Sequence, residues 1–584
     1  MSTGGAPANS QFSILNSQLS TLNFQLSTFN SQLSTLNFQF AMKRLIIFSL
    51  LLALAVAPAN AQWFKKGLFK KKETADTVPG MKRLTEVMTL LQKQYVIDPN
   101  TDKLSEDAIR HMFKSLDPHS MYIAAKDVRR QNEALQGNFE GVGITFSIIN
   151  DTICVQEVLA GGPSEKVGIL PGDKILRVDS VSATGDSASN AFVFRHLRGK
   201  KGTVVVVDAL RGKEDITFHI VRDKIPIHSI EVYFMEDDSI GYINLMRFAR
   251  NSVSEFRKAV DELRDQGMQS LILDLRGNSG GFLDIACGLS NEFLSPRRLI
   301  VYQEGRNRPR QEFRTNLFGS FRKGDLVVLI DESSASASEI VSGAVQDWDR
   351  GLIIGRRSFG KGLVQTMFTL SDGAQVRITT ARYYTPSGRC IQRPYDKGTD
   401  DYNQEFVKRY NHGEMFSADS IQLPDSLKYT THGGRTVYGG GGIMPDIFVP
   451  MDTTPATPFY RECRRKGIIN QFSNYWADQH RGDSLLADFD RFRANYDSLP
   501  VDSAFIAYAA TKGVSLDSLL LADSTDLQSY SFDTAEHFLL LQIKGMIADA
   551  LYGRGHYYRF MKEEDPVYRA AVDALRRRQP LLQR

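Results

Sequence analysis

Cysteine is scarce in this sequence, and the few cysteines form no ligand set. The 584 residues contain only four, and no two of them have the short spacing typical of zinc or iron–sulfur sites. A Gly-rich phosphate loop is absent too, so the sequence predicts neither a metal nor a cofactor. An oxidising compartment would permit disulfides, but the sequence does not pair these residues. They are Cys154, Cys287, Cys390 and Cys463.

Excess charge of one sign is also lacking. The formal net charge is +4, and no long basic run with interleaved aromatic residues occurs. Both features argue against nucleic acid as a partner. The fractions of hydrophobic residues, 42%, and charged residues, 24%, are ordinary for globular proteins, and the length allows several domains.

The apolar run near the N-terminus, Leu45–Ala57, is too short to span a bilayer. Basic residues, Lys43 and Arg44, precede it, and Ala59–Ala61 forms an Ala-x-Ala site directly after it. This pattern is typical of a secretory signal peptide, which we assign to 42–61. We therefore expect a mature chain that begins at Gln62 and is soluble in the periplasm or elsewhere outside the cytoplasm.

Residues 1–41 contain no charged residue, and Asn-Ser-Gln-Leu-Ser-Thr-Leu-Asn-Phe-Gln occurs in them twice, from Asn16 and from Asn30. A stacked repeat is one interpretation, but so few short polar copies cannot bury a core. We prefer a mis-assigned start codon ahead of Met42. Residues 62–80 are basic and poorly patterned, as in a solvated linker.

The chemistry is concentrated between Leu326 and Gln365. Leu326–Ile330 predicts a short strand, and a turn made almost wholly of Ser and Ala leads from it into a helix. Ser336 in this turn stands where a nucleophile would be placed, since a helix N-terminus offers free N–H groups to a developing oxyanion. The plainer interpretation is that Ser336 and Glu339 form only a capping box.

A candidate base follows in a glycine-flanked loop. Lys361 can activate a serine if burial lowers its pKa enough to populate the neutral amine. Gln365 could then hydrogen-bond the amine without adding charge. Taken alone, Lys361 would more simply be an exposed loop lysine.

Together these residues resemble the C-terminal processing peptidases, or tail-specific proteases, a Ser–Lys family. The chain has Ser-Ala-Ser-Ala-Ser-Glu at 334–339, Phe-Gly-Lys-Gly at 359–362 and then Gln365, with the family's interval from 336 to 361. The resemblance covers about 81–451. It implies that Ser336 is the nucleophile, Lys361 the base and Gln365 its orienting partner.

A segment with the signs of a β-rich module, 137–223, resembles a PDZ domain. Its strand and helix signals follow the PDZ order, with an Asn150-Asp151 turn between the first two strands. Gly141, Val142, Gly143 and Ile144 look like the loop that binds a peptide's terminal carboxylate, while the adjoining strand pairs with the peptide. The resemblance therefore implies protein or peptide substrates with apolar C-terminal tails.

A second serine motif offers an alternative nucleophile. Gly-Asn-Ser-Gly-Gly at 277–281 imitates the motif of trypsin-like proteases, some of which carry PDZ domains, and would make Ser279 the nucleophile. The PDZ-like segment precedes this motif, whereas in those proteases it follows. Asp-Leu-Arg-Gly-Asn-Ser-Gly-Gly also resembles the glycine segment that supports the oxyanion hole of the Ser–Lys family. On that resemblance the two oxyanion N–H groups belong to Gly281, in preference to Gly280, and to Ala337.

The predicted fold class is α/β and multidomain: a protease core of β-α-β units, an inserted PDZ-like domain, an N-terminal helical segment and a helical C-terminal region. Lys82–Tyr95, Ser105–Leu116 and Ser484–Tyr496 predict helices, and 393–435 predicts an irregular insertion over the cleft. His119, which follows a proline, is interpreted as a structural contact. The domains are 81–136, N-terminal helical segment; 137–223, PDZ-like; 224–451, protease core; and 452–584, helical, of unknown role.

The function that this organisation predicts is an exported serine endopeptidase that binds C-terminal tails and cleaves upstream of them. A peptide-binding protein with an inactive protease core is the competing hypothesis from another class. A regulatory or adaptor protein and a second copy of the chain are further partners that the sequence leaves open.

Overall fold

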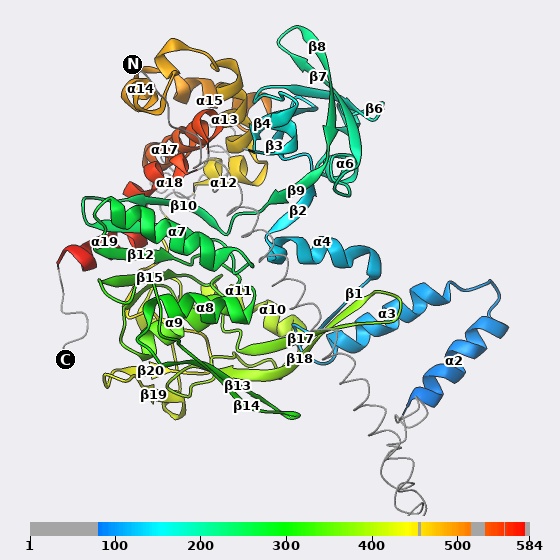
Figure 1. Ribbon diagram of the computed structural model, residues 1–584, viewed down its shortest axis with the longest axis vertical. Coiled ribbons are helices and arrows are strands. Elements are labelled where there is room, and N and C mark those ends of the chain that lie inside the picture. The colour runs from blue at the N-terminus through cyan, green and yellow to red at the C-terminus, as the bar shows by residue number, and fades with distance from the viewer. Residues whose placement is uncertain (1–79, 160, 454–456, 516–531, 554, 578–584) are drawn as a thin grey trace, which may run out of the picture. The chain divides into compact units, whose positions relative to one another are not determined.

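The computed structural model describes residues 80–159, 161–453, 457–515, 532–553 and 555–577 (Figure 1). The upstream extension, the signal peptide, nearly all of the linker and the mature N-terminus at Gln62 were predicted from residues that lie outside these ranges. The chain forms two compact units, 1–104 and 105–584. In the described parts, no helix has the length and apolar character needed to cross a membrane.

Three of the described helices precede the PDZ-like module, and two of them were predicted: α2 (Met81–Gln94) and α3 (Thr101–Lys114). The third, α4 (Ala125–Gln136), was missed because its sequence is polar and carries few apolar residues to mark a face. It ends at Gly137, whose φ of +73° is left-handed and where a Cβ would lie 2.6 Å from Asn251 Oδ1. Glycine at this C-cap is therefore required by both backbone and space.

The protease core is built on a six-stranded sheet in the order β10-β11-β12-β15-β16-β21. Only β10 and β11 pair antiparallel, and the others are parallel. Parallel strands are covered on both faces, so they read as continuous apolar runs, and all five residues of β15 are buried. The strands are β10 Ile230–Met235, β11 Ile240–Leu245, β12 Ser270–Asp274, β15 Leu326–Ile330, β16 Leu352–Gly355 and β21 Ile447–Phe448.

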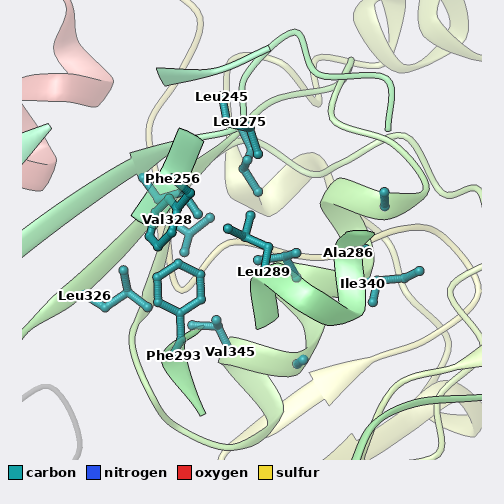
Figure 2. Packing of buried hydrophobic residues seen from close by; sticks show 14 of the residues in the cluster. Leu245, Phe256, Leu275, Ala286, Leu289, Phe293, Leu326, Val328, Ile340 and Val345 are labelled. Carbon is teal, nitrogen blue, oxygen red and sulfur yellow. The ribbon is translucent and has the colours of Figure 1, made fainter. Parts of the chain in front are cut away.

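Helices cover both faces of this sheet. On one face, α7 (Ser252–Asp265), α8 (Leu283–Phe293) and α9 (Ala337–Asp347) share one apolar core with alternate residues of the strands (Figure 2). On the other face lies α19 (Pro566–Arg576), whose Val567, Tyr568 and Ala571 pack on the opposite side chains of the same strands. Helix α19 is thus packed on the same sheet whose strands β12 and β15 lead into the glycine and serine motifs.

Helix α9 has no exposed face. All eleven residues are buried, including Ser338, Glu339 and Ser342. The Ser and Ala residues make this possible because they are small enough to let neighbouring backbone approach on every side. The helix is enclosed between α8, β13 and the strands, so its polar side chains must find partners inside the protein.

A second sheet flanks the core and carries the segment after Lys361. Its order is β1-β18-β13-β14, and β17 also pairs with β18. The β13–β14 hairpin was not predicted, because β14 is almost wholly exposed and charged. The strands are β1 Met121–Ile123, β13 Leu299–Gly305, β14 Arg308–Arg314, β17 Leu363–Thr369 and β18 Gln375–Tyr384.

The predicted irregular insertion contains regular structure: helices α10 (Thr399–Asn403) and α11 (Glu405–Asn411) and a hairpin of β19 (Lys428–Thr430) and β20 (Thr436–Tyr438). It packs behind the loop of Lys361, where Arg393 lies 4.0 Å from the ring centroid of Phe359. The expectation that it covers the cleft was wrong, since none of its residues lines the cleft described below.

The PDZ-like module is a separate sheet in the order β3-β4-β5-β7-β8, with β6 beside β5. A two-stranded ribbon of β2 (Asn138–Gly141) and β9 (Asp223–Pro226) joins its entry to its exit. The expected elements are present with shifts of a few residues at their ends. They are β3 Ile144–Ile149, β4 Thr152–Val158, α5 Pro163–Lys166, β5 Lys174–Val178, β6 Val181–Ser182, α6 Asn190–His196, β7 Val204–Arg211 and β8 Glu214–Val221.

The C-terminal region is helical, as predicted, and encloses a core of its own. The single helix expected over Ser484–Tyr496 is instead a short 3₁₀ turn followed by α14. Asp483 and Asp488 accept hydrogen bonds from backbone N–H groups of these two elements, and these caps divide the segment. The helices are α12 Pro458–Arg465, α13 Ile468–Gln479, α14 Phe489–Asn495, α15 Val501–Thr511, α17 Phe532–Tyr552 and α18 His556–Met561.

Candidate active site

The two glycine- and serine-rich motifs meet at one edge of the core sheet. Strands β12 and β15 are parallel neighbours, so the turns that follow them leave the sheet side by side. Ligands and catalytic groups in open α/β sheets gather at such carboxyl ends. Asn278, fully buried, joins the turns: its carbonyl accepts from Ala335 N–H (3.0 Å) and Ser338 Oγ (2.8 Å).

Ser336 stands between β15 and α9 in a conformation that residues other than glycine rarely adopt. Its φ is +55° and its ψ −106°. Two partners hold this strained turn: Ser336 N–H donates to Glu339 Oε2 at 2.7 Å, and Tyr383 Oη donates to the Ser336 carbonyl at 3.1 Å. Strain that surrounding contacts maintain is typical of functional positions, and nucleophilic serines in other folds sit on comparable turns.

The neighbouring serines have structural hydrogen bonds. Ser334 Oγ donates to the Leu275 carbonyl, Ser338 Oγ to the Asn278 carbonyl and Ser342 Oγ to the Ser338 carbonyl, each at 2.8 Å. All three are fully buried, whereas Ser336 is half-buried at the wall of a cleft. Among these serines, Ser336 is the one placed to meet a substrate.

Glu339 connects the serine turn to the lysine loop. Besides Ser336 N–H, its carboxylate accepts from Ser358 Oγ (2.6 Å) and from the N–H groups of Gly360 (2.7 Å) and Lys361 (2.9 Å). Burial raises the pKa of this carboxyl group, and the four donors oppose the shift. The sequence indicated only a capping residue here. The structure gives it a second task, which is to fix the loop that carries Lys361.

The side chain of Lys361 turns to the amide of Gln365. Lys361 Nζ donates to Gln365 Oε1 at 3.3 Å, and Gln365 Nε2 donates to the carbonyl of His119. This second bond determines which way the amide points, so the oxygen faces the lysine. A β-bulge between Val364 and Gln365 interrupts the simple alternation expected for β17.

Burial lowers the pKa of Lys361 below the ordinary value of a lysine, and the nearby charge of Arg377 adds to the lowering. The carboxylates of Glu339 and Asp117 oppose it. The oxygens of Glu339 already accept from four other donors. In the part of the chain that the structure describes, the one hydrogen bond of Lys361 Nζ is to a neutral amide. The arrangement therefore favours a neutral amine more than a direct ion pair would.

The segment 116–120 supplies the support behind Gln365, which sequence reasoning did not foresee. Asp117 Oδ1 accepts from the N–H groups of His119 and Ser120, both at 2.8 Å, and from Thr379 Oγ1 at 3.1 Å. The interpretation of His119 as a structural contact agrees with its ring, which lies 2.9 Å from Tyr402 Oη through Nε2. Burial, together with the charge of Lys361, lowers the pKa of His119 to about 4.

The proposed oxyanion groups face the same space as Ser336. Gly280 N–H is occupied by Asn278 Oδ1 (2.9 Å), but within the described residues neither Gly281 N–H nor Ala337 N–H has an acceptor. A Cβ on Gly280 would lie 2.8 Å from the Ala335 carbonyl oxygen and 3.0 Å from Ala337 N. Only glycine allows this turn to approach the helix N-terminus so closely.

A cleft of about 330 Å³ brings these groups together. Ser279 also lines it, yet none of the histidines that a trypsin-like triad would need does so. His196 stacks on Phe192 in the PDZ-like module, and His228 Nδ1 lies 2.9 Å from Glu255 Oε1. Among the lining residues are Ser336, Ala337, Lys361, Gln365, Gly281 and Ser279, with the apolar side chains of Leu135, Phe282, Leu283, Ile340, Leu363 and Met367.

The predicted carboxylate-binding loop has backbone geometry suited to a peptide. The Val142 carbonyl accepts from Ser164 N–H at 3.0 Å, and the Gly143 carbonyl accepts from Leu159 N–H at 3.1 Å. In a trans peptide the following N–H points the opposite way, so the N–H groups of Gly143 and Ile144 point away from these partners. Strand β3 is the edge strand of its sheet, and helix α13 packs against it. An edge strand is the element to which an extended peptide can add.

Sequence reasoning treated Val142 as part of the binding surface, but its side chain is only 4% exposed and belongs to the apolar core of the module. Gly141, by contrast, precedes this turn at the end of β2. This loop can therefore offer backbone N–H groups to a carboxylate, but not the side chain of Val142.

Metal chemistry finds no support in the described parts of the chain, where no group of three or more His, Cys, Asp or Glu side chains is placed to hold an ion. The four cysteines are free thiols. Burial raises the pKa of Cys154 to about 11 and those of Cys287 and Cys463 to about 12. Such thiols are poor nucleophiles at neutral pH.

Three segments of the chain match known protein families. Residues 239–401 match Peptidase family S41, and residues 141–221 match the PDZ domain. Residues 459–553 match a family of unknown function, DUF8443. The α/β class with a PDZ domain, predicted from the sequence, is thereby confirmed.

The chain spans just under two thirds of the length of one curated relative and about three quarters of another. A carboxy-terminal-processing protease of Bartonella bacilliformis is 35% identical over 323 residues, which are 54% of this chain and 74% of that protein. A probable CtpA-like serine protease of Staphylococcus epidermidis is 33% identical over 330 residues, 56% of this chain and 65% of that protein. Of solved structures, a photosystem II D1 C-terminal processing protease is 25% identical over 64% of this chain and 88% of its own, with a TM-score of 0.34.

Proposed function

Since the chain belongs to peptidase family S41, we propose that it is an exported serine endopeptidase that binds C-terminal tails through its PDZ domain and cleaves with a Ser336–Lys361 dyad. The observation that carries this proposal is the chain of contacts from Ser336 through Glu339 to the Lys361 loop. It holds a strained serine and a buried, weakly paired lysine at the wall of one cleft.

In the proposed reaction, Ser336 Oγ attacks the carbonyl carbon of the scissile peptide bond while Lys361 Nζ takes its proton. The carbonyl oxygen becomes an oxyanion, which the N–H groups of Gly281 and Ala337 stabilise at the positive end of α9. Lys361 then gives the proton to the departing amine, and an acyl-enzyme on Ser336 remains. Water, deprotonated by Lys361, hydrolyses this ester and restores the hydroxyl group.

Gln365 serves in this scheme as a positioning residue. Its amide oxygen orients the amine of Lys361 and adds no charge that would hold the lysine protonated. We do not retain the trypsin-like alternative with Ser279, because residues 239–401, which contain this serine, match family S41 and no histidine is among the residues that line the cleft. The inactive-core alternative is addressed by the experiments that follow.

Tail recognition predicts that the free C-terminus of a substrate matters. We expect kcat/KM to fall about tenfold or more when an apolar-tailed substrate is amidated, because the loop N–H groups then lose the carboxylate that they bind. A similar fall is expected when the substrate ends in Asp, because a charged side chain then replaces the apolar one next to β3. The measurement compares matched substrates with free, amidated and acidic ends. The substrate is modified in preference to the loop because a Val142→Asp substitution would bury a charge in the module's core and disturb its fold. Equal kcat/KM values for all three ends would refute tail reading.

Export predicts a shortened mature chain. N-terminal sequencing of protein isolated from the soluble envelope fraction should begin at Gln62, because the Ala59–Ala61 site follows a short apolar run. A peptide from 1–40 in that protein would contradict both the signal peptide and the start site that we assign.

A further inference from the structure

An arginine lies in the cleft beside the proposed base, and the mechanism above gives it no task. Arg377 is on β18, directly opposite Met367 of β17, and it lines the cleft together with Lys361 and Gln365. The register places its side chain on the same face as Gln365, since Gln365 pairs with Thr379, two residues further along β18.

The guanidinium of Arg377 is poorly satisfied. Within the described residues, its one hydrogen bond runs from Nη2 to Asn132 Oδ1 at 3.1 Å, and its Nε is buried without an acceptor. In the described part of the chain it forms no ion pair with a carboxylate. Burial lowers its pKa, which is what a partly desolvated cation without a counter-ion experiences.

Among the described residues, Arg393 and Arg481 also have a buried Nε without an acceptor, but neither lines the cleft, and three other enclosed arginines are better paired. Arg356 pairs with Glu332 at 2.9 Å, and Arg389 pairs with Asp347 at 2.7 Å. Arg350, which has no such pair, donates to two backbone carbonyls, those of Phe293 and Phe321, at 3.0 Å. A guanidinium carries five N–H donors in a planar fork that fits a carboxylate in bidentate fashion, so Arg377 has donors to spare.

We propose that Arg377 is a substrate-binding residue that takes a carboxylate of the bound peptide close to the scissile bond. The carboxylate comes either from an acidic side chain or from the C-terminus of the segment beyond the cut. The inference rests on the proposed function only in that the cleft holds a peptide. Asn132 of α4 acts as a positioning residue, because its neutral oxygen orients the guanidinium without neutralising it.

The test measures binding separately from cleavage. Peptides with amidated ends, identical except for Glu or Gln at each position within three residues of the mapped cut, are titrated against Ser336→Ala protein by fluorescence anisotropy. We expect a Glu peptide to bind about tenfold more tightly than its Gln partner at one position, as a charge-assisted bidentate pair should provide. Adding Arg377→Met should make the two affinities equal.

Two further variants make the assignment specific. Asn132→Asp keeps the shape of the side chain but supplies an internal carboxylate, so it should remove the preference for Glu while Arg377 stays in place. Arg382→Met, on the same strand but exposed and outside the lining, should keep the preference. To test whether the carboxylate is the peptide's C-terminus, peptides with free and with amidated ends are compared in proteins with Arg377 and with Arg377→Met, both carrying Ser336→Ala. An amidation effect that Arg377→Met abolishes identifies the terminal carboxylate, whereas one that persists belongs to the PDZ domain.

A Glu preference that survives Arg377→Met, or the absence of any carboxylate preference at every position and at the terminus, would overturn the proposal. Failure of the proposed function would look different. Cleavage that persists in Ser336→Ala, together with a Glu preference that depends on Arg377, would refute the Ser336–Lys361 chemistry and leave this assignment standing.

Discussion

Ser336→Ala and Lys361→Ala should each lower kcat/KM for an apolar-tailed, unfolded substrate by about 10⁴-fold or more. A nucleophile and its base act as a unit, so removal of either leaves only what the oxyanion hole and binding contribute. Binding of the same substrate, measured by anisotropy, should change little in Ser336→Ala. Lys361→Arg should be as inactive as Lys361→Ala, because a guanidinium does not give up its proton in the working pH range.

Ser279→Ala is the matched control for the nucleophile. Ser279 lines the same cleft and is more exposed than Ser336, but it lies outside the motif whose spacing pairs a serine with Lys361. We expect this variant to keep wild-type kcat/KM within a few fold. Full activity in Ser336→Ala would refute the dyad, and a folded but inactive Ser279→Ala with active Ser336→Ala would restore the trypsin-like alternative.

Glu339→Ala should destabilise the protease core more than any other single removal of a carboxylate near the site. Four donors converge on this fully buried group: three backbone N–H groups and the hydroxyl group of Ser358. Each buried donor left without an acceptor costs about 1–3 kcal/mol, and water that enters the site recovers part of this cost. We therefore expect the free energy of unfolding to fall by about 3 kcal/mol or more. The urea midpoint of unfolding is the readout.

Two companion variants separate shape from hydrogen bonding. Glu339→Gln keeps the volume but turns an NH₂ group toward backbone donors, so its midpoint should also fall, by less than that of Glu339→Ala. Glu312→Ala removes an exposed carboxylate that pairs with Arg310 and Arg314 and should leave the midpoint nearly unchanged. A Glu339→Ala protein as stable as the wild type would show that this carboxylate does not hold the Lys361 loop in place.

Sequence reasoning placed the residues of the candidate dyad correctly in local structure because short-range patterns determine those positions. An apolar run of strand length and a turn of small residues predicted β15 and the start of α9. The glycines at 360 and 362 predicted a loop that carries Lys361, followed by β17. The family's motif spacing then linked two segments that periodicity alone could not connect.

The remaining partners of the site come from distant parts of the chain, and no local pattern reveals them. The His119 carbonyl reaches Gln365 only because Asp117 anchors its turn to Thr379 on β18. In the sequence, Asn278 belongs to a motif that resembles that of trypsin-like proteases, but in the structure it joins the turns after β12 and β15. Such pairings follow from sheet topology, which the sequence did not provide.

Sequence reasoning also failed to predict which side chains and helices are buried. Val142 was expected on a binding surface, but the side chain is inside the module because the loop's backbone turns outward. The last helix was left without a role, yet α19 covers one face of the core sheet, and its cap residue Asp565 pairs with Arg276 of the glycine motif at 2.7 Å. An amphipathic pattern predicts that a helix such as α19 buries one face, but it does not show which strands that face packs against.

The central claim is that Ser336 becomes covalently acylated during turnover, and acid-quenched peptide mapping tests it most directly. Protein that is turning over an activated ester substrate, for which hydrolysis of the acyl-enzyme is slow, would be quenched and analysed by mass spectrometry. The account predicts one added acyl group, located on the peptide that contains Ser336, and no acyl group in the Lys361→Ala protein. An acyl group on Ser279, or steady turnover with no acyl group on any serine, would contradict it.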